Sequence, residues 1–281
     1  MKKSKIIVPA LGILVLSTAA AVTGTVAWFT SNNTLSVTGM HAKVDAENGI
    51  VVSNEAKSTW ATSAVAQHSG QDESFLLTST ADLATWYHNK SNDANESTAA
   101  EDYTTLTVAK PAAGTQTANT GLGTTTYNNQ AKNVYLINRF YIQSASGLEL
   151  TGQDIKVKNI AAAGNTGSAE LDKALRVAFK SSQTFVIYAP FSGASLSYNV
   201  AGTTATTAID GSLDETGDTQ TLLSNVTIPT FIQSGTTALE FEVYVYFEGE
   251  DAAAKSANIT ASLDDLTVSF EFENAITSTN P

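Results

Sequence analysis

Residues 239–248 read LEFEVYVYFE, and this stretch decides the fold class because apolar residues alternate with glutamate and tyrosine along it. Successive side chains of an extended strand point to opposite faces, so Phe241 and Val243 share one apolar face with their neighbours. The side chains predicted for the opposite, solvated face are those of Glu240, Glu242, Tyr244, Tyr246 and Glu248. This pattern is typical of an antiparallel sheet with one buried face.

Two further stretches point to the same fold class. Residues 266–272 alternate in the same way, with Val268 and Phe270 on the apolar side. Residues 134–142 are largely apolar on both sides, which predicts a central strand covered on both faces. We therefore predict a mainly β protein, an antiparallel β-sandwich or jelly roll with long loop insertions and one or two short helices.

The first strands are predicted to lie close to the N-terminus. Residues 35–38 alternate between apolar and polar, and residues 40–44 are able to continue that strand. Asn48 and Gly49 form a strong turn signal before a short apolar stretch at 50–53. This order predicts that the first two strands pair as a hairpin.

The middle of the chain is less regular. Polar tracts rich in Ser, Thr, Asn and Gly predict loop-rich insertions at about 54–132 and 192–220. Within the first insertion, only 103–108 is predicted as a strand, and 58–67 is predicted as a helix or an irregular segment. Further strands are predicted at 148–150, 155–160 and 228–232, with Gly152 in the turn between the first two. A short helix is predicted at 169–173. Residues 175–179 are predicted to form a hairpin with residues 185–188.

Composition narrows the class of protein. The chain has 281 residues, a formal net charge of −12 and no cysteine. It is long enough to bury a core, and we expect one β-sandwich domain over residues 28–281. Nucleic-acid binding requires a patch of basic residues, and this chain has an excess of acidic residues, so no nucleic-acid partner is expected. Without disulfides, stability must come from packing, strand pairing, bound cations or assembly.

Residues 1–27 show the three parts of an export signal. Lys2, Lys3 and Lys5 are basic, residues 6–16 are apolar, and residues 17–27 are mostly small. This order is typical of a cleaved signal peptide. We therefore predict that the protein is secreted and lies in the extracellular matrix or at the cell surface.

Two cleavage points fit the small-residue pattern. We favour cleavage between Ala27 and Trp28, where Thr25 and Ala27 precede the bond; cleavage after Ala21 is the alternative. A retained membrane anchor over residues 6–29 is the rival interpretation, since about 20 apolar residues cross a bilayer.

The residues that follow the apolar run resemble a known family. Residues 25–30 read TVAWFT and residues 35–40 read LSVTGM, similar to the start of TasA/camelysin-type matrix-fibre proteins of Gram-positive bacteria. Residues 241–251 and 266–272 are similar to the closing strands of clostridial relatives. The resemblance implies cleavage by a SipW-type signal peptidase, assembly with copies of itself, and a minor anchoring or accessory matrix protein as a further partner.

Cleavage after Ala27 would make Trp28 and Phe29 the new N-terminus. In a donor-strand mode, an extended segment completes the sheet of a neighbouring subunit through main-chain hydrogen bonds. The residues predicted to form this assembly strand are Trp28, Phe29, Leu35 and Val37, as the resemblance implies. The alternative is that this segment is simply the first strand of its own domain.

No catalytic motif is found, and we predict that the protein is not an enzyme. His41, His68 and His88 lack the H-E-x-x-H spacing of a zinc peptidase, and surface histidines are the simpler interpretation. The sequence contains no G-x-S-x-G nucleophile elbow and no cysteine nucleophile. A camelysin-like metallopeptidase is therefore the third choice for function.

Acidic turns are the best cation candidates. Calcium prefers oxygen ligands on flexible turns, and two such stretches contain clustered carboxylates. The candidate ligands are Asp210, Asp214, Asp218, Glu250 and Asp251. Neither stretch has EF-hand spacing, so solvated acidic loops without a cofactor are the simpler interpretation.

These observations predict a structural subunit of an extracellular fibre or biofilm matrix. The alternative is a monomeric cell-surface module that binds carbohydrate or host protein through the loops at 54–132 and 192–220.

Overall fold

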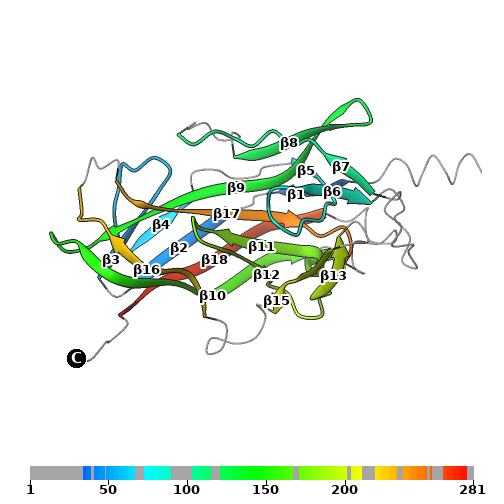
Figure 1. Cartoon of the computed structure of the whole chain (residues 1–281). Coiled ribbons are helices and arrows are strands. Elements are labelled where there is room, and N and C mark those ends of the chain that lie inside the picture. Colours follow the sequence, from blue (N-terminus) through cyan, green and yellow to red (C-terminus); the bar gives the residue numbers. More distant parts are fainter. Residues whose placement is uncertain are drawn as a thin grey trace, which may run out of the picture. The chain divides into compact units, whose positions relative to one another are not determined.

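A computed structural model gives the fold of the chain (Figure 1). It describes residues 34–38, 41–47, 49–66, 73–89, 103–114, 121–166, 171–200, 204–210, 219–232, 237–251, 254 and 262–276. These residues belong to one compact unit, Thr34–Pro281. The predicted signal peptide and residues Ala27, Trp28 and Phe29 lie outside the described residues. No helix in the described ranges is long and apolar enough to cross a membrane.

The strands form one large sheet that folds over into two facing layers (Figure 1). The first layer contains, in order, β15 (Ile209–Asp210), β12 (Phe185–Ala189), β11 (Leu175–Lys180), β17 (Leu239–Phe247) and β9 (Gln130–Ser144). The second contains β4 (Ser63–Val65), β2 (His41–Glu47), β18 (Ser262–Ile276), β10 (Leu150–Thr166) and β16 (Gln220–Ile228). Two short strands, β5 (Glu73–Leu76) and β1 (Thr34–Thr38), connect β9 to β18.

Aromatic side chains fill the space between the layers. The ring of Phe270 on β18 lies 5.5 Å from Phe140 on β9 and 4.8 Å from Phe179 on β11, centroid to centroid. Phe241 on β17 lies 4.7 Å from Phe272 on β18. These contacts join strands of opposite layers, and the predicted mainly antiparallel β-sandwich is confirmed.

The outer face of the first layer is also largely buried. A small sheet of β6 (Trp86–Asn89) and β7 (Tyr103–Leu106) covers it, and Trp86 lies 4.8 Å from Tyr135 and 5.0 Å from Tyr246. The prediction that Tyr244, Tyr246 and Glu248 face solvent is therefore wrong. The prediction that residues 134–142 are covered on both faces is confirmed.

The first insertion thus contains ordered strands. Besides β6 and β7, it includes β4, β5 and β8 (Leu122–Tyr127), which pairs with β9. Residues 58–66, predicted to belong to a helix or an irregular segment, are irregular apart from β4. The second insertion contains a small hairpin of β13 (Ser197–Val200) and β14 (Thr204–Thr207), followed by β15.

The predicted first hairpin is wrong. Gly49 does adopt a left-handed turn conformation, with φ at +78°, but β2 pairs with β18 and β4 whereas β3 (Ile50–Asn54) pairs with β9. The chain crosses from one layer to the other here. Crossing allows Ala42, Ile50 and Val52 to contribute to the same core.

Several other boundaries differ from the predictions. The two strands predicted around Gly152 are one strand, β10, which passes through Gly152 with bulges against β16. The strand predicted at 228–232 lies earlier, as β16. The hairpin of β11 with β12 is confirmed. In place of the short helix predicted at 169–173, the described residues contain a 3-10 turn at Leu171–Ala174, and Ala254 also has 3-10 conformation.

Candidate functional site

The first described strand, β1, lies in the interior of the sheet. It pairs antiparallel with β5, with Leu35 opposite Phe75, and parallel with β18, with Val37 opposite Leu263. We call the position between β5 and β18 that β1 occupies the β1 slot. Two of the predicted assembly residues, Leu35 and Val37, thus belong to a strand that has a neighbour on each side.

The β5 side of the β1 slot is attached to the rest of the fold without β1. Phe75 pairs with Asn133 of β9, and its ring lies 5.9 Å from that of Phe247. Directly after β5, the amide of Thr78 donates to the carbonyl of Phe247 at 3.0 Å. The β5 wall is therefore held by the first layer.

The β18 side is attached in the same way. β18 pairs with β10 along most of its length, and residues 267–273 also pair with β2. β1 covers only residues 262–264 of β18. Removing β1 would therefore leave both walls of the β1 slot with their other partners.

The acidic turn after β17 holds the segment that follows β5. Buried Glu248 accepts a hydrogen bond from the hydroxyl of Ser79, and the amide of Gly249 donates to Thr78 O at 3.2 Å. Glu250 accepts from Asn89 Nδ2 at 2.9 Å. The turn thus joins β17 to β5 and β6.

Asp251, a calcium candidate, forms a buried ion pair instead of facing solvent. Arg176 Nη2 donates to Asp251 Oδ2 at 2.8 Å, and the amide of Ser195 donates to the same oxygen at 2.7 Å. Both side chains are buried. The interpretation of this stretch as a solvated acidic loop is wrong at Glu248 and Asp251.

The remaining calcium candidates are not brought together in the described part of the chain. Asp210 ends β15, and its side chain is not described; Asp214 and Asp218 lie outside the described residues. Where the structure describes side chains, no group of three His, Asp or Glu residues is placed to hold a metal ion. Calcium binding stays a prediction.

The histidines do not form a zinc site in the described residues either. His88 is buried, and its Nδ1 donates to Leu77 O at 2.8 Å, so the expectation of a surface histidine is wrong there. Burial lowers the pKa of His88, although the hydrogen bond to Leu77 acts in the opposite direction. His41 lies on β2 without a described side chain, and His68 lies outside the described residues.

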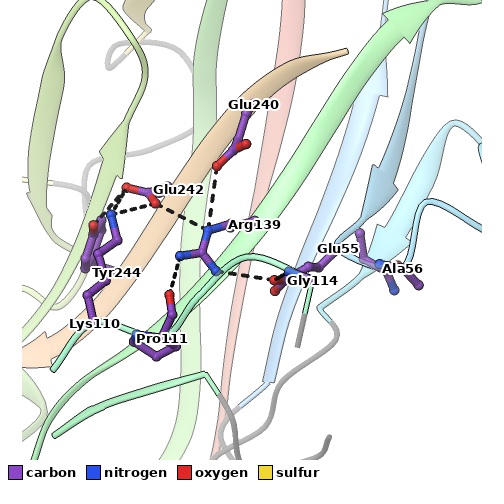
Figure 2. A network of polar contacts seen from close by, with 10 residues as sticks. Glu55, Ala56, Lys110, Pro111, Gly114, Arg139, Glu240, Glu242 and Tyr244 are labelled. Atoms are coloured by element: carbon purple, nitrogen blue, oxygen red, sulfur yellow. Dashed lines mark hydrogen bonds and ion pairs between the residues drawn. The ribbon is translucent and has the colours of Figure 1, made fainter. Parts of the chain in front are cut away.

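A polar network surrounds Arg139 on the outer face of β9 (Figure 2). Its Nη1 lies 3.3 Å from Glu55 Oε1, its Nε 3.3 Å from Glu242 Oε1, and its Nη2 donates to Pro111 O at 2.8 Å. The side chains of Arg139 and Glu55 are only 4% and 1% exposed. Glu240, which is 45% exposed, approaches Nε to 3.6 Å from the outer side.

Glu242 is the second centre of this network. It accepts from Lys110 Nζ at 2.7 Å and from the Tyr244 hydroxyl at 2.8 Å. Burial alone would raise the pKa of Glu242, but these hydrogen bonds and the charges of Lys110 and Arg139 lower it below its ordinary value. Burial, with the nearby Glu242 charge, raises the pKa of Tyr135 to about 12. The network therefore pairs ionised carboxylates with cations and holds residues 110–114 against the sheet.

The ion pairs of Arg139 with Glu55 and of Arg176 with Asp251 were not predicted from the sequence, although the arginines themselves stand out in it. Arg139 and Arg176 are the only arginines of the chain, and each lies within an apolar stretch. A charged residue inside a strand that is covered on both faces requires a buried partner. The partners Glu55 and Asp251 lie far away in sequence, so the pattern does not identify them.

The described residues define a mainly antiparallel β-sandwich protein. The chain matches no protein-family model, no curated protein and no solved structure.

Proposed function

We propose that the protein is an exported structural subunit of an extracellular fibre or biofilm matrix, in which copies are joined by the N-terminal strand in a donor-strand manner. The observation that carries the proposal is the position of β1 between β5 and β18. The export-signal pattern of residues 1–27 and the TasA/camelysin resemblance support the same function.

The physical argument concerns what holds β1 in place. A strand with two neighbours is bound by main-chain hydrogen bonds, which are the same whichever copy supplies the strand. An N-terminal strand is exchanged easily because only one end of it is tied to the domain. A second copy that inserts its β1 therefore regains the contacts that the first copy gives up.

The charge and composition of the chain are consistent with this function. The net charge of −12 includes three lysines of the export signal, so the cleaved subunit would be more acidic, which keeps monomers soluble before assembly. Because the chain has no cysteine, stability must come from packing, strand pairing, bound cations or assembly. A SipW-type signal peptidase would act during export, and an accessory matrix protein would anchor the fibre.

Two truncated chains test the proposal. A chain that begins at Trp28 contains the whole compact unit, whereas a chain that begins at Gly39 lacks β1. We expect filaments from the first chain in negative-stain electron microscopy and no filaments from the second. A synthetic peptide of residues 28–38 should bind the second chain and raise its melting temperature, and a peptide with Ser36→Pro should not.

Folded monomers from the chain that begins at Trp28, at all concentrations, would overturn the fibre proposal. In that case the alternative, a monomeric module that binds carbohydrate or host protein, would be tested with a glycan array. If the chain that begins at Gly39 is unfolded and the peptide does not restore its fold, then β1 is an ordinary strand of its own domain.

A further inference from the structure

Edge strands present unpaired backbone groups to solvent, and another chain can pair with them. Among the described strands, β16 pairs only with β10, so it forms an edge of the second layer. It is nine residues long, which is long enough to serve as a template for a strand from another copy. Its free edge is therefore a potential pairing surface.

Two side chains occupy that edge. Ser181 Oγ donates to Leu222 O at 2.6 Å. The Ser224 amide donates to Gln183 Oε1 at 2.9 Å, and Gln183 Nε2 donates to Ser224 O at 3.2 Å. The carboxamide of Gln183 thus bonds to both backbone groups of Ser224, as the peptide group of a paired strand would.

The turn that carries these side chains is itself well organised. It connects β11 to β12 in the first layer, and the Ser181 amide donates to Thr184 O at 2.9 Å. The amides of Gln183 and Thr184 donate to Ser181 Oγ at 3.1 Å and 3.0 Å. The turn therefore holds Gln183 against a strand of the opposite layer.

We propose that Ser181 and Gln183 form a plug that closes the β16 edge, a latent site for pairing with a strand of a second copy of this chain. The plug restricts association of copies through this edge. The inference goes beyond the proposed function and does not depend on exchange of β1.

Two other edges of the described sheet show related features. On β4, the carbonyl of Val65 accepts a hydrogen bond from Asn54 Nδ2 at 2.9 Å. On the first layer, β15 contains only two residues. Side-chain caps and very short strands are both ways to prevent edge-to-edge pairing.

Removing the plug should change association more than folding. Gln183 is exposed, and the Ser224 backbone regains water when the carboxamide is absent. Each such hydrogen bond contributes little net stability, because a hydrogen bond to water replaces it. The exposed backbone groups would then be available to a second chain.

The test compares Gln183→Ala and Gln183→Leu with the parent chain that begins at Trp28. Gln153→Ala is the matched control, because the Gln153 carboxamide also donates to a backbone carbonyl, that of Thr151, but Gln153 lies on β10, opposite Val226 on the paired side of β16 and not at its free edge. Sedimentation velocity should show association of both Gln183 variants at concentrations where the parent and control do not increase in size. Their melting temperatures should stay within a few degrees of the parent.

Hydrogen exchange at the Ser224 amide distinguishes this edge from the β1 slot. In the parent, we expect the hydrogen bond to Gln183 to protect this amide at every concentration. In the Gln183 variants it should exchange at least tenfold faster when dilute and become protected as the chains associate. Variants that associate no more than the parent, with Ser224 still unprotected at high concentration, would overturn the proposal. If copies do not exchange β1, the hydrogen exchange expected at the Ser224 amide stays the same, so the two proposals can fail separately.

Discussion

Leu35 of β1 lies opposite Phe75 of β5 in antiparallel register, and the two strands connect the layers of the sandwich. Ser36 and Val37 in the middle of β1 have a partner residue on both neighbouring strands. A single substitution in β1 can therefore test its role in assembly.

Ser36→Pro removes a backbone donor in the middle of β1 and fixes φ, so it weakens insertion of the strand. We expect the chain that begins at Trp28 to lose at least tenfold of its filament mass, measured by sedimentation of polymers. Ser36→Thr keeps the N–H group and favours strands, so it should polymerise like the parent. Equal filament mass from the proline variant would show that β1 does not join the subunits.

The buried pair of Arg176 and Asp251 should be sensitive to removal of one partner. Arg176→Met leaves the carboxylate buried without its guanidinium, and we expect a loss of about 3–5 kcal/mol in the free energy of unfolding. Lys158→Met is the control, because Lys158 lies 3.7 Å from both Glu271 and Glu273 at a partly exposed position. That change should cost less than about 1 kcal/mol.

Urea unfolding at neutral pH measures both variants. A loss below about 1 kcal/mol for Arg176→Met would contradict the expected cost of leaving the Asp251 carboxylate buried without its cation.

His88 should make stability depend on pH. Its pKa in the folded protein lies below the ordinary value of 6.5, so near and below pH 6.5 the unfolded chain binds a proton that the folded chain does not. Stability is therefore highest above pH 6.5 and falls as the pH decreases, by up to about 1.4 kcal/mol per pH unit.

Urea unfolding between pH 7.5 and 5.5 measures this effect. His88→Gln retains a donor for Leu77 O and removes the titration, so its stability should change less over the same range. An equal pH dependence in the variant would assign the effect to other groups.

Gly123 on β8 lies opposite Tyr135 on β9, and a methyl group at this position would overlap the tyrosine ring. The ring has little freedom to move, because it packs 4.8 Å from Trp86 and 5.1 Å from Tyr244. We expect Gly123→Ala to destabilise the protein by about 1–3 kcal/mol.

Gly147→Ala is the control for that change, because no atom lies within 4 Å of the added methyl group. Thermal melts of both variants provide the comparison. Equal melting temperatures would mean that the Tyr135 ring and its cover rearrange at little cost.

Much of the strand content was predictable from local pattern. Residues 239–247 and 266–272 alternate strictly, and both lie in long strands, β17 and β18. The apolar character of both faces of residues 134–142 correctly indicated burial on both sides. These features depend only on the period of a strand, which a sequence displays directly.

The solvated face predicted for residues 239–248 illustrates what local pattern misses. Tyr244 and Tyr246 are compatible with water, but Trp86 of β6, far away in sequence, covers this face. Tyrosine tolerates both environments, because it has an apolar ring and a polar hydroxyl group. The alternation therefore predicted the strand correctly and the exposure of one face incorrectly.

The sequence by itself determined that this chain forms antiparallel strands around an apolar core, because alternation of side chains is a local property. Only the tertiary structure decided that β1 pairs with both β5 and β18, and that Asp251 is buried against Arg176. Those relationships join residues that are distant in the chain. They depend on how all the layers pack together, and no short stretch of sequence contains that information.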